Sequence, residues 1–313
     1  MDSFAGKLAV VTGGGSGMGR ELVVKLAAAG CAVAACDVRQ AAAEETAALA
    51  RAGAPDGTTV TAHACDVADA AQVARFRDEA LAAHATGNHG AGDHGAGHVD
   101  LVFANAGLGG GGSFINDPPE MWERVFAIDF WGVYHCARVF LPLLMRSPEG
   151  VLVNTSSVNG FWASLGPGVP HTAYSTAKFA VKGFSEALVE DLRINAPNVR
   201  VVLVMPGHVA TNIVANSLMA FGVPEKDAIE AGQGFHDSAP LSAAGAADVI
   251  LDGVRSGAWR VLVGEDAHRL DQYVRAHPED AYDYEKMSAV LSGGLAEDPA
   301  DMLDIARRSG LVL

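Results

Sequence analysis

The stretch LAVVTGGGSGMG, residues 8–19, joins a short apolar run to a cluster of glycines. A helical pattern follows and continues to Gly30, and a second apolar run over residues 31–36 ends at Asp37. A strand, a glycine turn and a helix, in that order, are the context that a dinucleotide fingerprint requires. Glycines let the backbone approach a pyrophosphate, and the first N–H groups of the helix carry partial positive charge. Asp37, about 20 residues after the glycines, is placed to hydrogen-bond the ribose hydroxyls of an adenosine.

Helix and strand patterns alternate along the chain as far as residue 264. We expect strands at residues 59–64, 99–104, 151–157, 199–205 and 259–263, and helices at 70–84, 119–145, 173–195 and 243–256, with another helix ending near Gly53. Short apolar strands that alternate with helices favour a doubly wound α/β fold with a parallel sheet. At 313 residues, half of them hydrophobic, the chain can bury one large core.

Tyr174 and Lys178 fall four residues apart in a predicted helix, and so lie one turn above each other on the same face. A phenol loses its proton near pH 10, so it is a useful base at neutral pH only when a neighbouring group stabilises the phenolate. The lysine ammonium is placed to do this. The apolar run over residues 151–157 ends at Ser157, which a buried strand would deliver to the carboxyl edge of the sheet. Ligands bind at that edge in open α/β sheets, so we expect these three side chains to form a site there.

Further motifs follow the glycine turn in a defined order. The full set is Thr12, Gly13, Gly17 and Gly19 in the spacing Thr-Gly-x-x-x-Gly-x-Gly, then Asp66-Val67, Asn105-Ala106-Gly107, Ser157, Tyr174, Lys178, and Pro206-Gly207 with Thr211. Over about residues 5–264 the chain therefore resembles a short-chain dehydrogenase/reductase of the classical subtype. The resemblance implies a Rossmann fold with seven parallel strands.

Residues 265–313 match nothing in the core of that family. We expect two or three amphipathic helices there, packed on the open edge of the sheet or on a neighbouring subunit. The predicted division is thus a catalytic domain over residues 1–264 and a helical extension over residues 265–313.

The resemblance also implies which residues hold a nicotinamide dinucleotide. They are Gly13, Ser16, Gly17, Met18, Gly19, Asp37, Asp66, Val67, Asn105, Ala106, Gly107, Tyr174, Lys178, Pro206, Gly207, Val209 and Thr211. Thr211 is expected on the carboxamide and Asp66 on the adenine, although Asp66 would equally cap the helix that follows. Asp37 favours NAD, because it would accept hydrogen bonds from the ribose and repel the 2′-phosphate of NADP. Arg39 is a nearby cation, which we interpret as a solvated residue at a helix start.

The implied reaction passes a hydride between the nicotinamide and a secondary alcohol or ketone. Tyr174 would exchange the hydroxyl proton, Lys178 would lower the pKa of Tyr174 and hold the nicotinamide ribose, and Ser157 would hydrogen-bond the developing oxyanion. Asp129 departs from the family, which usually has Asn there as the fourth catalytic residue. Because the family's proton relay uses the main-chain carbonyl at that position, we expect the Asp129 side chain to be secondary.

Candidate substrate contacts are Ser157, Asn159, Trp162 and His208. Trp162 and the adjacent Phe161 would either line an apolar pocket or anchor the loop over residues 158–170, and the sequence leaves both open. Residues 212–236 lack sharp periodicity and are expected to form the mobile segment that selects the substrate. The residues that select a substrate follow no transferable code, so the alcohol or ketone is not readable from them.

The acidic balance, a net charge of −15, disfavours nucleic acid and anionic membranes as partners. Residues 1–7 are short and polar, so we expect no signal peptide there, and no apolar run approaches the roughly 18 residues of a membrane span. The four cysteines form no CxxC pair, so we expect reduced core residues and a cytoplasmic protein. The resemblance further implies a homo-oligomer, tetramer or dimer, that acts on a small molecule.

A low-complexity stretch over residues 86–98 contains the repeat HGAGD-HGAGH. Its apolar content is too low to fold. Histidines at this density suggest a metal site, but flexible glycines impose no ligand geometry. We therefore interpret the stretch as a surface loop and expect no metal.

Three alternative functions stay open. An epimerase or dehydratase of the extended subtype would show Gly-x-x-Gly-x-x-Gly, which this chain lacks. An acyl-carrier-protein or other NADPH ketoreductase would need a basic docking patch, and Asp37 and the net charge argue against it. A nucleotide-binding protein without activity would usually have lost Ser157, Tyr174 or Lys178.

Overall fold

The central sheet has seven parallel strands in a computed structural model that describes residues 1–85, 97–110, 112–163 and 170–291. They are β1 (Leu8–Thr12), β2 (Ala32–Asp37), β3 (Val60–Ala64), β4 (Leu101–Ala104), β5 (Gly150–Thr155), β6 (Val199–Pro206) and β9 (Arg260–Val263). Their order is β3-β2-β1-β4-β5-β6-β9, so the chain winds outward from β1 in one direction and then from β4 in the other. This confirms the predicted doubly wound α/β fold, with its switch point between β1 and β4.

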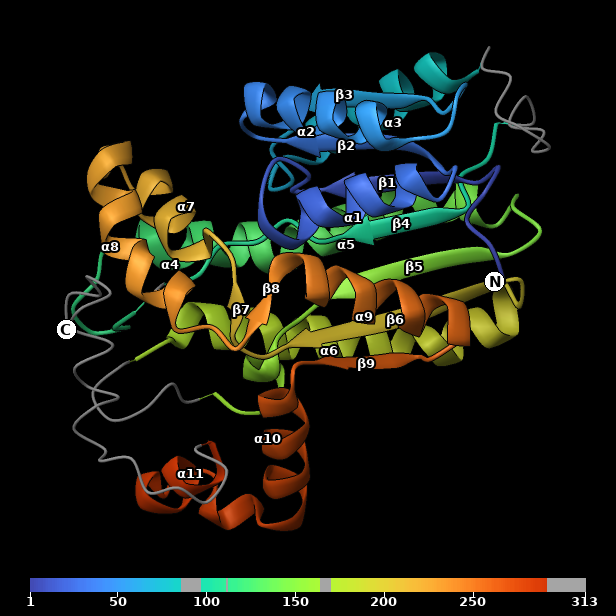
Figure 1. Cartoon of the computed structure of the whole chain (residues 1–313). Helices are drawn as coiled ribbons and strands as arrows, with labels where there is room; N and C mark the ends of the chain where they lie inside the picture. Colours follow the sequence, from blue (N-terminus) through green and yellow to red (C-terminus); the bar gives the residue numbers. More distant parts are fainter. Residues whose placement is uncertain (86–96, 111, 164–169, 292–313) are drawn as a thin grey trace.

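Helices cover both faces of the sheet (Figure 1). One face carries α1 (Gly17–Ala28), α2 (Gln40–Gly53) and α9 (Ala243–Ser256), and the other carries α3 (Ala70–His84), α5 (Gly132–Leu144) and α6 (Thr172–Asn195). Val10 and Val11 of β1 point to opposite faces of the sheet. Val10 packs toward α3, α5 and α6, Val11 packs toward α1, α2 and α9, and both are 0% exposed. Strands that are covered on both faces carry apolar side chains on both faces, so their sequences are continuous apolar runs.

The predicted helix over residues 119–145 is interrupted. It begins as α4 (Pro119–Phe126), passes through a π-helical turn at Ala127–Trp131 and continues as α5. The Gly132 N–H donates to the Ala127 carbonyl, five residues back. A Cβ at Gly132 would lie 2.7 Å from Val67 Cγ2, so glycine lets this helix approach the turn after β3. Single π turns in α-helices are frequent at functional sites, and this one contains Asp129.

The segment that we expected to select the substrate forms helices α7 (Ile213–Ala220) and α8 (Glu225–Asp237) beyond the carboxyl end of β6. Two short strands, β7 (Val209–Ala210) and β8 (Leu241–Ser242), pair in parallel at its base. A Cβ at Gly232 of α8 would lie only 3.1 Å from the Ala215 nitrogen of α7, so the two helices pack closely. Each helix buries only two residues, which explains the weak periodicity.

Beyond β9 the chain continues as α10 (Glu265–Ala276), a 3₁₀ turn η4 (Pro278–Asp280) and α11 (Tyr284–Leu291), which project from the edge of the sheet (Figure 1). A hydrophobic cluster that includes Trp162, Leu270 and Met287 joins them to the 3₁₀ turn η3 (Val158–Gly160) that follows β5. Residues 292–313, and residues 86–96 of the expected histidine loop, lie outside the described residues. Within the described part of the chain, no helix has the length and apolar character needed to cross a membrane.

Candidate active site

The glycine turn after β1 packs directly on the turn after β4. Gly13 has φ +65°, and a Cβ there would lie 2.8 Å from Ala106 Cα. Thr12 Oγ1 accepts the N–H groups of Asn105 and Ala106, each at 3.1 Å, and Asn105 Nδ2 donates to the Thr12 carbonyl at 3.1 Å. At Gly19 a Cβ would overlap the Gly13 carbonyl. The two predicted cofactor motifs are therefore one structural unit that has no space for side chains.

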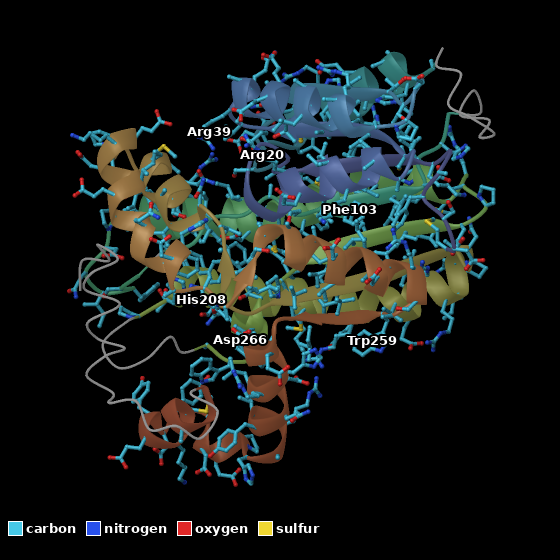
Figure 2. The ribbon with its side chains drawn as sticks, viewed as in Figure 1. Arg20, Arg39, Phe103, His208, Trp259 and Asp266 are labelled. Atoms are coloured by element: carbon cyan, nitrogen blue, oxygen red, sulfur yellow. The ribbon has the colours of Figure 1, made fainter. Side chains whose placement is uncertain are left out.

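Asp37 lies beside this turn. Its Oδ2 accepts the Gly15 N–H at 3.0 Å, and its Oδ1 accepts the Arg39 N–H at 2.9 Å. The Arg39 side chain, at the start of α2 (Figure 2), donates to Asn216 Oδ1 of α7 at 3.2 Å. Asn216 Nδ2 in turn donates to Ser16 Oγ at 3.0 Å. Arg39 is therefore exposed, as expected, but it connects the helical segment α7–α8 to the cofactor motif.

The predicted nicotinamide turn, residues 206–211, closes the other side of the glycine motif. Thr211 lies against Gly17, whose Cβ would be 3.3 Å from Thr211 Cβ. Val209, within β7, is 4% exposed. Met18 is partly buried and packs against the hydrophobic cluster on the α1 face of the sheet.

Asp66 stands at the end of β3, where its Oδ1 accepts the Ala68 N–H at 3.0 Å and its Oδ2 pairs with Arg124 at 2.8 Å. The alternative that Asp66 caps the next helix is wrong, because the cap of α3 is Asp69, whose carboxylate accepts the N–H groups of Ala71 and Gln72. The adenine contact of Asp66 stays a prediction.

Ser157, Tyr174 and Lys178 come together at the carboxyl end of β5. Ser157 lies two residues past the strand, and the other two lie one turn apart on α6. All three are buried, with 6%, 9% and 3% of their surfaces exposed. Ser157 acts on Tyr174 to lower the pKa of the phenol, and the Lys178 ammonium lies 5.3 Å from the centre of the Tyr174 ring. Lys178 Nζ also donates to the Thr155 carbonyl at 3.3 Å, which fixes α6 to the end of the strand.

Asp129 forms an ion pair with this lysine. Its Oδ1 lies 3.0 Å from Lys178 Nζ and accepts the Leu108 N–H at 3.1 Å, and the side chain is 0% exposed. A Cβ at Gly107 would come within 2.6 Å of that oxygen, so the Asn105-Ala106-Gly107 motif makes room for the carboxylate. Oδ2 is buried and has no hydrogen-bond partner in the described structure. The side chain is therefore the charged partner of Lys178, and the expectation that the main-chain carbonyl carries the proton relay stays a prediction.

The charges shift the pKa of each group. Burial raises the pKa of Asp129, and Lys178 opposes that rise. Burial alone would lower the pKa of Lys178, but the Asp129 and Tyr174 charges raise it above its ordinary value. Burial raises the pKa of Tyr174, Lys178 and Ser157 lower it, and Asp129 raises it, with a net upward shift. Lys178 thus acts on Tyr174 in the expected direction, but burial outweighs it.

The predicted substrate residues are held differently. Asn159 donates its backbone N–H to Ser157 Oγ at 3.2 Å and its Nδ2–H to the Trp162 carbonyl at 3.0 Å. The Trp162 indole N–H donates to the Ala281 carbonyl at 2.5 Å, so Trp162 anchors the turn to the C-terminal extension. Residues 164–169 of the same loop lie outside the described structure.

His208 is also engaged away from an open site. Its Nε2–H donates to the Phe235 carbonyl of α8 at 2.7 Å, and its backbone N–H donates to Asp266 Oδ2 of α10 at 2.7 Å. Figure 2 shows His208 and Asp266 at the junction of these segments. Asp266 also fills the space next to Gly207. The expected substrate contact of His208 therefore has no support from this geometry.

Sequence reasoning missed His171, Asn216 and Asp266. Asn216 and Asp266 contact the predicted cofactor motifs from segments with no motif of their own. His171 lies three residues before Tyr174, and the centres of the two rings are 4.9 Å apart. The spacing to Tyr174 at the start of a helix is the only sequence signal that could have identified one of them.

Comparisons with known proteins agree with this fold. A family model described as short chain dehydrogenase matches residues 7–220. The putative oxidoreductase SadH of Mycobacterium tuberculosis is 35% identical over 277 residues, which are 88% of this chain and 92% of that protein.

Two solved structures share the fold. A short chain dehydrogenase/reductase from Burkholderia phymatum, in complex with NAD, has a TM-score of 0.74 and 30% identity over 90% of this chain and 95% of its own. A metagenomic short-chain oxidoreductase in complex with NADP has a TM-score of 0.55 and 29% identity over 65% of this chain and 83% of its own.

We predict that Asp129→Asn, which removes the negative charge that opposes the phenolate, lowers the pKa of Tyr174 at pH values where Lys178 keeps its proton. Titration of ¹³C-labelled tyrosine by NMR measures this pKa directly. Asp69→Asn, which removes an exposed carboxylate elsewhere, is the control and should leave the Tyr174 titration unchanged. An unchanged Tyr174 pKa in Asp129→Asn would show that the buried carboxylate does not act on the tyrosine.

We predict that Trp162→Phe destabilises the packing of the extension, because it leaves the buried Ala281 carbonyl without its donor. Loss of a buried partner costs about 1–3 kcal/mol, to be read from the free energy of unfolding in urea. Trp259→Phe alters a half-exposed indole and is the matched control, with an expected change within about 0.5 kcal/mol. Equal effects of the two substitutions would refute the anchoring role.

Proposed function

This chain belongs to the short-chain dehydrogenase/reductase family, and on that premise we propose that it is an NAD-dependent oxidoreductase that interconverts a secondary alcohol and a ketone. The observation that supports this most directly is the convergence of Ser157, Tyr174 and Lys178 at the carboxyl edge, beside the glycine turn. Side chains that only accept or only donate hydrogen bonds could bind a ligand. A tyrosine next to a lysine can in addition exchange a proton with the ligand.

The residues present fit a nicotinamide dinucleotide. The turn has no space for side chains, α1 begins at Gly17 with no acidic residue in its first turn, and a buried Asn105 Oδ1 has no partner among the described residues. The first N–H groups of α1 would hold the pyrophosphate, and Asp37 would accept bonds from the adenosine ribose. When bound, the nicotinamide would accept or supply the hydride.

The chain's own residues would move the proton. Tyr174 gives its hydroxyl proton to the ketone oxygen, or takes one from the alcohol, and Ser157 donates a hydrogen bond to the same oxygen. Lys178, held in its charged form by Asp129, stabilises the phenolate. The upward pKa shift of Tyr174 keeps the phenol protonated at neutral pH, so alcohol oxidation should rise as the pH rises through this ionisation.

The proposal is tested by Tyr174→Phe, which removes the hydroxyl and keeps the ring. Reduction of NAD is measured against a panel of secondary alcohols, from short aliphatics to terpenoids and steroids. We expect the variant to lose about 10²- to 10⁴-fold in kcat while its affinity for NAD, measured by calorimetry, changes little. Substantial turnover by the variant would show that Tyr174 is not the group that exchanges the proton with the substrate.

We further propose that Asp37 selects NAD over NADP. The two solved relatives contain one cofactor each, and the support in this chain is the position of the carboxylate beside Gly15. With NADP the Asp37 carboxylate would lose its hydrogen bonds to the ribose and repel the 2′-phosphate. The binding free energies of NAD and NADP would then differ by about 3 kcal/mol, which is a preference for NAD on the order of a hundredfold.

The measurement compares kcat/KM for NAD and NADP with one active alcohol. Asp37→Ala should bring the ratio of kcat/KM for NAD to that for NADP toward one. Arg39→Ala should not, because it removes a positive charge that could attract the 2′-phosphate of NADP. Equal use of both cofactors by the unmodified chain would rule out Asp37 as the selector.

We also propose a homo-oligomer that pairs through α5 and α6. Phe130 and Tyr134 contact Phe184 across these helices, with ring centres 6.4 Å and 6.2 Å apart. Trp131 contacts Phe130 and Tyr134 and is 44% exposed, and Phe179 of α6 is 42% exposed. Exposed aromatic groups on adjacent helices are typical of protein interfaces.

Light scattering should give a mass that is a multiple of 32.3 kDa. The double substitution Trp131→Glu and Phe179→Glu should shift the protein to monomer, because it would bury charge in the interface. Leu49→Glu, at an equally exposed position on α2, should leave the mass unchanged. A monomer mass for the unmodified protein would contradict the proposal.

A further inference from the structure

His171 precedes α6 and has one ring nitrogen without a partner. Its Nε2 accepts the Gly110 N–H at 3.2 Å, so in the neutral ring the proton is on Nδ1. Nδ1 is buried, and no hydrogen-bond partner for it exists in the described structure. Burial lowers the pKa of His171 to about 4, so the ring is neutral at pH 7. His171 therefore presents an Nδ1–H donor that no described residue accepts.

The His171 ring lies beside the catalytic tyrosine, which belongs to an apolar cluster. The His171 and Tyr174 rings are 4.9 Å apart, and Tyr174 belongs to a small cluster with Val125 and Ala173, against which Trp122 and Phe221 pack. A buried donor costs free energy unless it is bonded, and the large majority of buried polar groups in folded proteins have a partner. A donor left unpaired beside the reacting group is best explained by a partner that arrives with the ligand.

The charge of that partner follows from the site. Asp129 already neutralises Lys178, and a neutral imidazole cannot compensate a second buried anion. A carboxylate buried here would be unfavourable, whereas a neutral carbonyl oxygen would need one donor only. The His171 and Tyr174 rings would each donate one hydrogen bond of about 3 Å to the ligand. Because the two rings are adjacent, the two ligand oxygens that accept these bonds would lie a few ångströms apart.

We propose that His171 Nδ1–H binds the substrate, and that the substrate is a ketone with a second, uncharged carbonyl acceptor close to the reacting one, as in a 3-oxo or 4-oxo ester. This rests on the proposed function, because it takes Tyr174 as the group that contacts the reacting oxygen. His171 then determines specificity, because its hydrogen bond favours substrates that have the second carbonyl.

Two substitutions separate the two ring nitrogens. His171→Gln places an amide oxygen near the Nε2 position, where it can accept the Gly110 N–H, and removes the donor at Nδ1. His171→Asn places an amide N–H near the Nδ1 position and gives up the contact with Gly110. The two variants change the same residue, but only the first removes the proposed substrate contact.

The probes are ethyl 3-oxobutanoate and ethyl 4-oxopentanoate, compared with 2-heptanone and 2-octanone, whose chains have the same lengths without the ester. Dissociation constants are measured by NMR titration of the full chain loaded with oxidised NAD, in which a ketone cannot be reduced. Turnover of the same ketones with NADH is measured separately. Binding thus tests His171, and turnover tests the proposed function.

We expect the unmodified chain to bind at least one oxo ester about tenfold more tightly than its matched ketone. His171→Gln should lose this preference and His171→Asn should retain most of it. The inference is overturned if the preference is absent, or if both variants change it equally. Binding preference without turnover of any ketone would support the role of His171 and refute the proposed reaction.

If either variant fails to fold, the unmodified chain still decides. With ¹⁵N-labelled histidine, the Nδ1 signal of His171 should shift on addition of an oxo ester and stay in place with the matched ketone. The same signal in both titrations would overturn the inference.

Discussion

Lys178 carries a charge at a position that is 3% exposed, and a buried ammonium group is stable only when it is paired and hydrogen-bonded. The structure meets this need from three directions: the Asp129 carboxylate, the Thr155 carbonyl and the face of the Tyr174 ring. Each partner comes from a different element, so the charge holds the π turn, the end of β5 and α6 at fixed distances. Gly107 belongs to the same arrangement, because a side chain there would displace Asp129.

The parallel sheet supplies the frame for these contacts. All seven strands of the described sheet run in one direction, so their carboxyl ends meet at one edge. The glycine turn follows β1, the motif from Asn105 to Gly107 follows β4, and Ser157 follows β5, next to the switch point between β1 and β4. Motifs that are separated by about half the chain in sequence therefore become neighbours at this edge of the sheet.

The C-terminal helices contribute to both sides of the site. Trp162 ties the turn that holds Ser157 to the Ala281 carbonyl, and Asp266 at the start of α10 accepts the His208 N–H in the predicted nicotinamide turn. Arg260 of β9 forms a bidentate pair with Asp271, which holds α10 to the sheet, and these hydrogen bonds and that of Arg275 keep the pKa of Asp271 low against the effect of burial. Helices outside the family model thus help to position two motifs inside it.

Local pattern in the sequence was enough to predict the strands and helices, the doubly wound sheet and the meeting of Ser157, Tyr174 and Lys178, because strand periodicity, glycine spacing and a four-residue interval on a helix are properties of neighbouring residues. It did not reveal that Asp129 pairs with Lys178, that Trp162 faces the extension, or that no described residue accepts the Nδ1–H of His171. Those outcomes depend on which groups lie opposite each other after packing. A buried polar atom takes its partner from whatever element is nearest in space, and only the tertiary structure decides which element that is.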